Sequence, residues 1–340
     1  MEERESLAYK ASLSYELKMV DTEAKFHSVM KKHEGDNVRI AYSGGSDSDC
    51  LMWLSRLYGY NVTGVFYDTG MEYKATKDHL NYMRDNGFTI EIAKSKHSIP
   101  WALKNYGYPF ISKNASELLH RLQRNNFKFK EDGNKTYEEL IILYPRAKGA
   151  LSWWTNHNGP TNKFNIERNR GLKEYLIKND GLPFKTSVKC CDVTKKNVMH
   201  DYSKENNIQL VITGIRKAEG GRRATKITSC YLPAKFSPYD MYYPLFWWKN
   251  EDKARFIKEQ NIKLSDCYEI YGMSRTGCIG CPFGRKLEEE LDILETYEPK
   301  LHRIATTIFK KSYDSTREYR QFVKEELPLN RNGKRNGKLK

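Results

Sequence analysis

One segment of the sequence constrains the fold most, because it joins a short apolar strand to a helix through a glycine-rich turn. Residues 37–42 have the pattern of a buried strand, and residues 47–58 place Leu51, Leu54 and Leu57 on one face of an expected helix. The turn between them begins the hexapeptide Ser43-Gly44-Gly45-Ser46-Asp47-Ser48. Glycines let the backbone approach an anion closely, hydroxyls donate hydrogen bonds, and the N–H groups that open a helix point at the ligand. The sequence therefore predicts a phosphate-binding loop.

Two other glycine-containing loops do not fit this turn. The nucleophile elbow of serine hydrolases has a glycine on each side of the serine with one residue between, a spacing that differs from this one. The common nucleoside triphosphatase loop ends in Gly-Lys-Ser/Thr, which does not follow here. The setting between strand and helix, rather than the glycine pair alone, makes the signal specific.

Strands and helices alternate along the first half of the chain. Residues 16–32 and 75–86 have helical spacing, whereas residues 62–67, 88–93 and 209–215 are expected to be strands. This alternation predicts an α/β fold with a doubly wound, mostly parallel sheet covered by helices on both faces. Ligands of such sheets bind beyond the carboxyl ends of the strands.

Composition and charge suggest how the chain is organised. With 39% hydrophobic residues the chain can bury a core, and 58 basic against 43 acidic residues leave a formal charge of +15, which favours anionic partners. We expect an α/β nucleotide-binding domain over residues 1–240 that carries a helical insertion at about 111–185. A cysteine loop and helical C-terminal region would cover residues 241–328, followed by a basic disordered tail over 329–340.

The insertion mixes basic and aromatic side chains, and this mixture has two interpretations. It holds 14 basic and 8 acidic residues between 111 and 185. Its aromatic residues include Phe127, Phe129, Tyr144, Trp153, Trp154 and Phe164. Basic residues interleaved with aromatic ones can clamp phosphates and stack on bases. The same aromatic residues can instead form the local core of a solvated helical insertion, and the spacing does not decide between the two.

The cysteines point to metal chemistry in a cytoplasmic protein. No stretch approaches the roughly 20 apolar residues that span a membrane, and the N-terminus lacks a signal-peptide pattern, so we expect a cytoplasmic location and no membrane partner. Cys190-Cys191 and Cys278-Ile-Gly-Cys281 supply four candidate thiolate ligands, which suit a zinc ion or an iron-sulfur cluster. Adjacent side chains point apart, which favours separate irons of a 4Fe-4S cluster over one small zinc ion.

These motifs together resemble the phosphoadenylyl-sulfate reductase family of the adenine nucleotide α-hydrolase superfamily, whose fold is the HUP type of doubly wound sheet. The hexapeptide is similar to its Ser-Gly-Gly-x-Asp-Ser motif, and Asp68-Thr69-Gly70 to its Asp-Thr-Gly. The segment from Thr213-Gly214 to Arg216, with Arg222 and Arg223, resembles its Gly-x-Arg segment. Tyr243-Pro244 and the cysteine pairs also match, the latter resembling the 4Fe-4S motif of assimilatory adenylyl-sulfate reductases.

The resemblance implies roles for individual residues. Ser43, Gly44, Gly45 and Ser48 would hold phosphate or sulfate oxygens, and Asp47 would order the loop or a magnesium ion. Asp68, Thr69 and Gly214 would lie beside an adenine nucleotide, ATP or adenylyl sulfate, and Arg216, Arg222 and Arg223 would neutralise the anionic leaving group. Ser46 departs from the pattern, because many relatives carry lysine there, and this leaves open what neutralises the outer phosphates.

Three functions remain open from the sequence. The reductases resemble one another in a cysteine of a C-terminal Glu-Cys-Gly segment that attacks sulfur, but no cysteine follows Cys281 here, and Cys50, Cys230 and Cys267 are the remaining candidates. The first function is ATP cleavage between the α and β phosphates and sulfur transfer to a nucleic acid, DNA or tRNA, with a donor such as a cysteine desulfurase. The second is reduction of a sulfonucleotide by an external thiol such as thioredoxin. The third is a nucleic-acid-binding accessory role without turnover.

Overall fold

The computed structural model describes residues 9–159, 162, 165–220, 227–235, 237–284 and 286–327. The chain divides into two compact units. The first, here called the sheet unit, consists of Met1–Lys96 and Thr194–Cys278, and the second, the helical unit, of His97–Val193 and Ile279–Lys340. The expected boundary at residue 240 lies inside the sheet unit. Arg222, Arg223, Phe164 and the expected tail lie outside the described residues.

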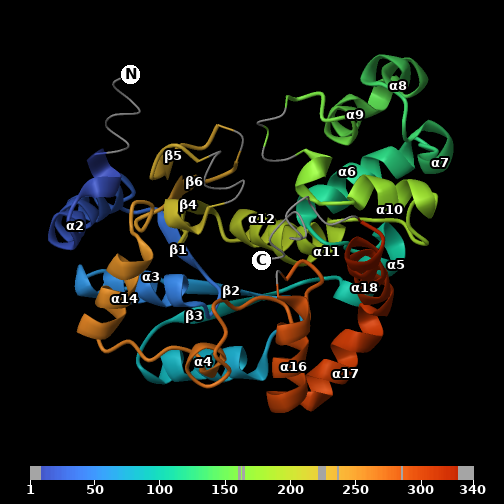
Figure 1. Cartoon of the computed structure of the whole chain (residues 1–340). Helices are drawn as coiled ribbons and strands as arrows, with labels where there is room; N and C mark the ends of the chain where they lie inside the picture. Colours follow the sequence, from blue (N-terminus) through green and yellow to red (C-terminus); the bar gives the residue numbers. More distant parts are fainter. Residues whose placement is uncertain are drawn as a thin grey trace. The chain divides into compact units, whose positions relative to one another are not determined.

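The sheet unit contains a six-stranded sheet with the order β3-β2-β1-β4-β6-β5 (Figure 1). Its strands are β1 (Asn37–Tyr42), β2 (Gly64–Asp68), β3 (Ile90–Lys94), β4 (Ile208–Ile212), β5 (Tyr231–Leu232) and β6 (Asp240–Tyr242). All neighbours pair in parallel except β5 and β6. Ile40 of β1 lies between Gly64 of β2 and Ile212 of β4. Strands β2 and β3 thus lie on one side of β1, and β4 and β6, which come later in the chain, lie on the other. The carboxyl ends of β1 and β4 therefore form a topological switch point, where ligands of such sheets bind.

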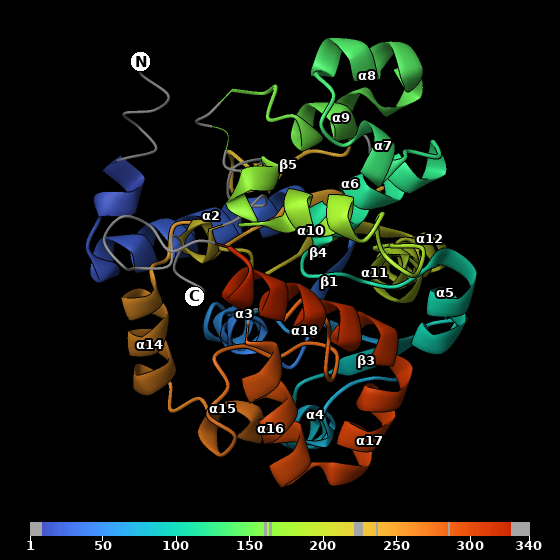
Figure 2. The same ribbon diagram turned by 45° about the vertical axis from the view of Figure 1, so that its right-hand side comes forward.

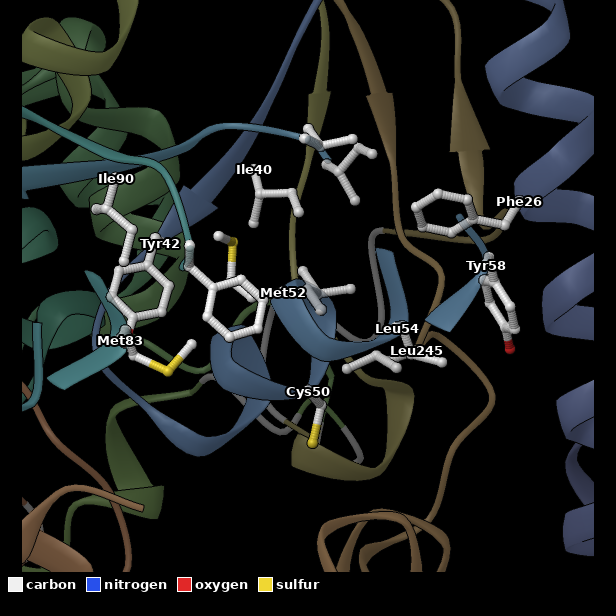
Figure 3. Packing of buried hydrophobic residues seen from close by; sticks show 14 of the residues in the cluster. Phe26, Ile40, Tyr42, Cys50, Met52, Leu54, Tyr58, Met83, Ile90 and Leu245 are labelled. Atoms are coloured by element: carbon white, nitrogen blue, oxygen red, sulfur yellow. The ribbon is translucent and has the colours of Figure 1, made fainter. Parts of the chain in front are cut away.

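Helices cover both faces of this sheet, as the alternating pattern predicts. They are α2 (Tyr15–Lys32), α3 (Ser46–Leu57), α4 (Lys74–Asp85), α12 (Asn197–Glu205), α14 (Asn250–Glu259) and α15 (Asp266–Glu269). On one face, Ile40 and Tyr42 pack with Leu54 of α3 and Phe26 of α2 in the main core (Figure 3). On the other face, smaller clusters join Val198 of α12 to the strands. The predicted doubly wound, mostly parallel α/β fold is therefore confirmed.

The helical unit combines the insertion with the C-terminal helices. Its helices are α5 (Ile99–Tyr106), α6 (Lys113–Arg124), α7 (Phe129–Asp132), α8 (Tyr137–Leu143), α9 (Lys148–Trp154), α10 (Leu172–Lys178), α11 (Lys189–Cys191), α16 (Leu287–Tyr297), α17 (Pro299–Ile308) and α18 (Lys310–Glu325), with short 3₁₀ turns at Pro145–Ala147 and Ile166–Arg168. Helix α18 packs on α10 (Figure 2), where the rings of Tyr175 and Tyr319 are 5.6 Å apart and Lys178 Nζ lies 2.6 Å from Glu326. Segments that the sequence assigns to an insertion and to a C-terminal region thus share one unit.

The aromatic residues of the insertion settle one of the open interpretations. Phe127, Phe129, Trp153 and Trp154 are buried in one core cluster, and Tyr144 packs against it. The Trp154 indole N–H donates to the carbonyl of Gly133 at 2.9 Å. These four side chains therefore form a local core, and their burial excludes the alternative in which they stack on nucleic-acid bases. Within the described part of the chain, no helix has the length and apolar character to span a lipid bilayer.

Helix α3 offers a matched test of the main core. Leu54 is fully buried, whereas Leu57, expected on the same apolar face, is 49% exposed because it lies in the last turn of the helix. Leu54→Ala removes buried methyl groups and is expected to lower the free energy of unfolding by about 3 kcal/mol. Leu57→Ala is expected to change it by no more than about 0.5 kcal/mol. Urea unfolding of both variants measures the difference, and equal losses would contradict this packing.

Candidate functional site

The predicted phosphate loop connects β1 to α3 at the switch point of the sheet. Gly44 has a φ of +68°, and a Cβ there would lie 2.7 Å from the Thr76 side chain, so only glycine fits without strain. Gly45 is the N-cap of α3, and Ser46 is the first residue of the helix. The loop therefore has the strand-turn-helix geometry that the sequence predicts, with the N-terminus of α3 behind it.

Ser48 holds the loop closed from inside. Its hydroxyl donates to the Gly45 carbonyl at 2.7 Å and accepts from the N–H groups of Ser43 and Gly45 at 3.3 and 3.2 Å. Ser48 is buried, whereas Ser43 is exposed. The Ser48 hydroxyl thus orders the turn, and it also lies 3.3 Å from the Ser43 hydroxyl.

A buried polar network that sequence reasoning missed lies beneath the loop. The Tyr42 hydroxyl donates to Asp49 at 2.8 Å, and His79 Nε2 of α4 lies 3.0 Å from the other oxygen of the same carboxylate. Asp49 is completely buried. Because Tyr42 and Asp49 flank the loop on either side, their hydrogen bond ties the end of β1 to the first turns of α3. The signal in the sequence was an additional acidic residue directly after the hexapeptide.

Asp47 is the centre of a charged cluster. Arg216 Nε donates to its Oδ1 at 2.5 Å, and Lys253 Nζ of α14 lies 3.4 Å from the same oxygen. Arg216 is buried and donates a second hydrogen bond to Asn250 Oδ1 at 3.0 Å. The structure thus brings together the predicted residues Asp47 and Arg216, and adds Lys253, which sequence reasoning missed.

Gly214 lies directly against the first turn of α3. A Cβ at this position would be 3.0 Å from the Asp47 Cβ and 3.1 Å from its main-chain carbonyl. The segment after β4 can therefore approach the loop only because residue 214 has no side chain. This close approach explains why glycine is present in a motif that the resemblance assigns to nucleotide binding.

Two further residues of the sheet unit cover the loop. Ser46 N–H donates to the Tyr268 hydroxyl at 3.2 Å. A Cβ at Gly45 would lie 3.2 Å from both the Tyr268 hydroxyl and Thr276 Oγ1. Tyr268 belongs to α15, and no local pattern predicts its contact with the loop, which lies more than 200 residues away in sequence. The main-chain N–H of Ser46, at the start of α3, thus has the Tyr268 hydroxyl as its hydrogen-bond acceptor.

Asp68 and Thr69 follow β2 and form a second polar group with Glu72. The Gly70 N–H donates to Asp68 at 2.8 Å, and the Thr69 hydroxyl donates to Glu72 at 2.8 Å. Burial, followed by a hydrogen bond with Asp68, raises the pKa of Glu72 to about 7. Burial also acts to raise the pKa of Asp68, but hydrogen bonds from Glu72 and Gly70 outweigh it and leave that pKa below its ordinary value. A protonated Glu72 can thus donate to an ionised Asp68.

The four candidate cysteine ligands belong to both units of the chain. Cys278 ends the sheet unit, where its Sγ lies 3.8 Å from Thr69 Oγ1, and Cys190, Cys191 and Cys281 belong to the helical unit. Among the residues that the structure describes, no three His, Cys, Asp or Glu side chains are arranged to hold a metal ion. Four thiols remain a suitable donor set for zinc or a cluster, so the metal centre stays a prediction.

The remaining cysteines have distinct environments. Cys50 is fully buried in the main core, where burial raises the pKa of its thiol. Cys267 is also fully buried, with its Sγ 3.6 Å from the Thr76 hydroxyl, and Cys230 is partly exposed.

The fold is that of a doubly wound α/β protein with a glycine-rich loop at the switch point of its sheet. Residues 160–283 match the family model described as the phosphoadenosine phosphosulfate reductase domain. This stretch is therefore similar to a domain of that family, which confirms the resemblance predicted from the sequence. No curated protein matches the chain significantly.

Solved structures resemble the chain only distantly. A phosphoadenylyl-sulfate reductase from Candida auris, in a phosphate complex, is 14% identical over 71% of this chain and 81% of the reductase, with a TM-score of 0.39. An NH3-dependent NAD synthetase from Campylobacter jejuni is 14% identical over 93% of this chain and 98% of the synthetase, with a TM-score of 0.36. A U34-tRNA thiolase from Methanococcus maripaludis with a [4Fe-4S] cluster is 12% identical over 93% of this chain and 82% of the thiolase, with a TM-score of 0.36.

The close approach at Gly214 generates a prediction. Gly214→Ala adds a methyl group against the Asp47 main chain, and the resulting displacement is expected to cost about 1–3 kcal/mol of the free energy of unfolding. Gly277→Ala is the matched control, because a Cβ there meets nothing within 4 Å, and it is expected to stay within about 0.5 kcal/mol of the parent. Urea unfolding gives both values, and amide hydrogen exchange in the first turn of α3 should accelerate in Gly214→Ala alone. Unchanged exchange would contradict the contact.

Proposed function

We propose that this chain is an enzyme that binds ATP at the loop Ser43–Ser48, cleaves it between the α and β phosphates, and uses the adenylate for sulfur transfer. The main support is the charged cluster at the loop. Two cations, Arg216 and Lys253, meet the single carboxylate of Asp47 and leave an excess positive charge beside a helix N-terminus. A polyphosphate is an anion that balances such a site.

The residues of the site have complementary roles in this reaction. Ser43 and the loop amides would hold phosphate oxygens, and Ser48 would keep the turn in shape. Asp47 would orient Arg216, or a magnesium ion if one accompanies ATP. Arg216 and Lys253 would stabilise the negative charge that develops on the departing pyrophosphate. Arg222 and Arg223 stay proposals from the resemblance alone.

The bond changes of the proposed reaction are simple. An oxygen of the acceptor attacks the α-phosphorus of ATP, and pyrophosphate leaves with the electron pair of the broken P–O bond. The outer sulfur of a donor persulfide, supplied for example by a cysteine desulfurase, then displaces AMP at the activated position and leaves a disulfide between acceptor and donor. A second thiol attacks the donor sulfur of that disulfide, which releases the thiolated acceptor and forms a new disulfide on the donor. The acceptor exchanges one oxygen for sulfur, and DNA or tRNA is the acceptor class that we propose.

A metal centre on Cys190, Cys191, Cys278 and Cys281 is a separate part of the proposal. It is supported by donor chemistry, namely an adjacent cysteine pair and a Cys-x-x-Cys turn in which Gly280 adopts a φ of +54°. A 4Fe-4S cluster is the preferred occupant and zinc the alternative. The center would supply thiolate-bound iron chemistry when bound, and no step above depends on it.

Reduction of a sulfonucleotide is the second candidate, because residues 160–283 match a phosphoadenosine phosphosulfate reductase domain. An external thiol such as thioredoxin would then supply electrons, and sulfite would be the product. Cys230 is the partly exposed candidate nucleophile, whereas Cys50 and Cys267 are buried. An accessory protein that binds nucleic acid without turnover is the third candidate.

The proposal predicts that ATP yields pyrophosphate with a suitable nucleic acid acceptor. Asp47→Asn keeps the shape of the side chain but removes the charge that pairs with Arg216, so pyrophosphate release is expected to fall at least tenfold. Asp78→Asn, on the exposed face of α4, is the control and should retain the parent rate. A coupled phosphate assay after pyrophosphatase treatment measures the product.

Other results of the same assay would overturn the assignment. Sulfite from adenylyl sulfate or its 3′-phosphorylated form, without pyrophosphate from ATP, would establish the reductase. Salt-sensitive binding of DNA or RNA that Ser43→Ala and Asp47→Ala leave unchanged, without either product, would establish the accessory role.

The metal centre predicts iron and sulfide in anaerobically purified protein, with a broad absorption band in the blue. Cys191→Ser and Cys278→Ser each remove one thiolate and are expected to abolish the band. Cys50→Ala is the control, because this cysteine lies in the main core, and it should keep the iron. Stoichiometric zinc in place of iron would overturn the cluster, and metal content unaffected by both serine variants would overturn the ligand set.

A further inference from the structure

The phosphate loop itself carries no cation, although it is expected to bind a highly charged anion. Residue 46, at the start of α3, is serine where many similar loops have lysine. In this structure an amine nevertheless reaches that position from another helix. Lys253 Nζ donates to Ser46 Oγ at 2.9 Å, across 207 residues of sequence.

The stability of α14 does not explain this lysine. Lys253 is the fourth residue of the helix, where the partial positive charge of the helix N-terminus disfavours a cation. Its side chain is only 17% exposed, so most of it is covered by the surrounding chain. By contrast Asp252, the preceding residue, accepts from the buried amine of Lys18 at 2.6 Å and from the Lys249 N–H, both of which stabilise the local fold.

The charges around Lys253 are not balanced. Its carboxylate neighbour is Asp47, 3.4 Å away, which already accepts the shorter hydrogen bond from Arg216. Two cations therefore share one anion, while the adjacent carboxylate of Asp252 is paired with Lys18. An anion bound at the loop would restore the balance, and the amine of Lys253 lies beside the first helical residue of that loop.

We propose that Lys253 is the phosphate-binding cation of this site, and that it binds the outer phosphates of a nucleoside triphosphate in place of a lysine at position 46. This inference rests on the proposed function, since it takes the loop to be an ATP site. It makes Lys253 a specificity-determining residue. Removing its charge weakens binding of ligands with outer phosphates and leaves binding of a nucleoside monophosphate nearly unchanged.

Four proteins test this assignment: Lys253→Ala, Lys253→Ala combined with Ser46→Lys, the control Lys258→Ala, and the parent. Lys258 is an exposed lysine on the same helix. Isothermal titration at one fixed ionic strength gives the dissociation constants for ATP and AMP. Lys253→Ala is expected to bind ATP about ten- to a hundredfold more weakly. Its affinity for AMP should stay within about twofold, and Lys258→Ala should match the parent for both.

The combined variant separates charge from structure. Ser46→Lys returns a cation to the loop, so ATP affinity should recover by at least tenfold over Lys253→Ala. An equal loss of ATP and AMP affinity without recovery would mean that Lys253 only supports the shape of the loop, and would overturn the inference. Parent affinity in Lys253→Ala would do the same while leaving the ATP site intact. Failure of the parent to bind ATP would overturn the proposed function and this inference with it.

Discussion

The ion pair between Asp47 and Arg216 is the interaction on which the site depends. It joins the first turn of α3, which follows β1, to the segment that follows β4. These two strands are neighbours in the sheet, with Ile40 paired to Ile212, so their carboxyl ends bring both segments to one place. Arg216 is buried, and a buried cation without its carboxylate is strongly destabilising. The pair therefore holds the first turn of α3 against the segment that follows β4, and Gly214 permits the close approach of the two backbones.

The parts that were predictable from sequence are those specified by residues close together in the chain. The strand at 37–42, the loop and the helix after it follow from apolar spacing and glycine placement, and the parallel sheet follows from alternation. The sequence-based predictions missed two features, and each has a physical reason. Leu57 has the correct spacing but lies where α3 reaches solvent. Strands β5 and β6 have two and three residues, too few for an alternating pattern to be recognised.

The parts of the site that sequence reasoning missed depend on contacts between distant residues. Lys253 and Tyr268 reach Ser46 from more than 200 residues away, and neither lies in a motif that names its partner. Glu72 lies close in sequence to its partners Asp68 and Thr69, but its raised pKa results mainly from burial, which the sequence does not reveal. A motif specifies the backbone of a phosphate loop. The charges that surround the loop are set by tertiary packing, so another protein with the same motif can supply them from another helix.

The composition of the insertion is compatible with two interpretations, and the helical unit shows which one applies to its buried aromatic residues. Basic and aromatic residues alternate along the insertion, yet the aromatic rings are buried whereas Arg124, Lys130, Arg146 and Lys148 are exposed. Each short helix is too small to bury its apolar face alone, so the helices share one aromatic core and turn their charges outward. Any nucleic acid that binds this surface would therefore contact charged side chains rather than those buried rings. Phosphate contacts of that kind depend strongly on salt and weakly on base sequence.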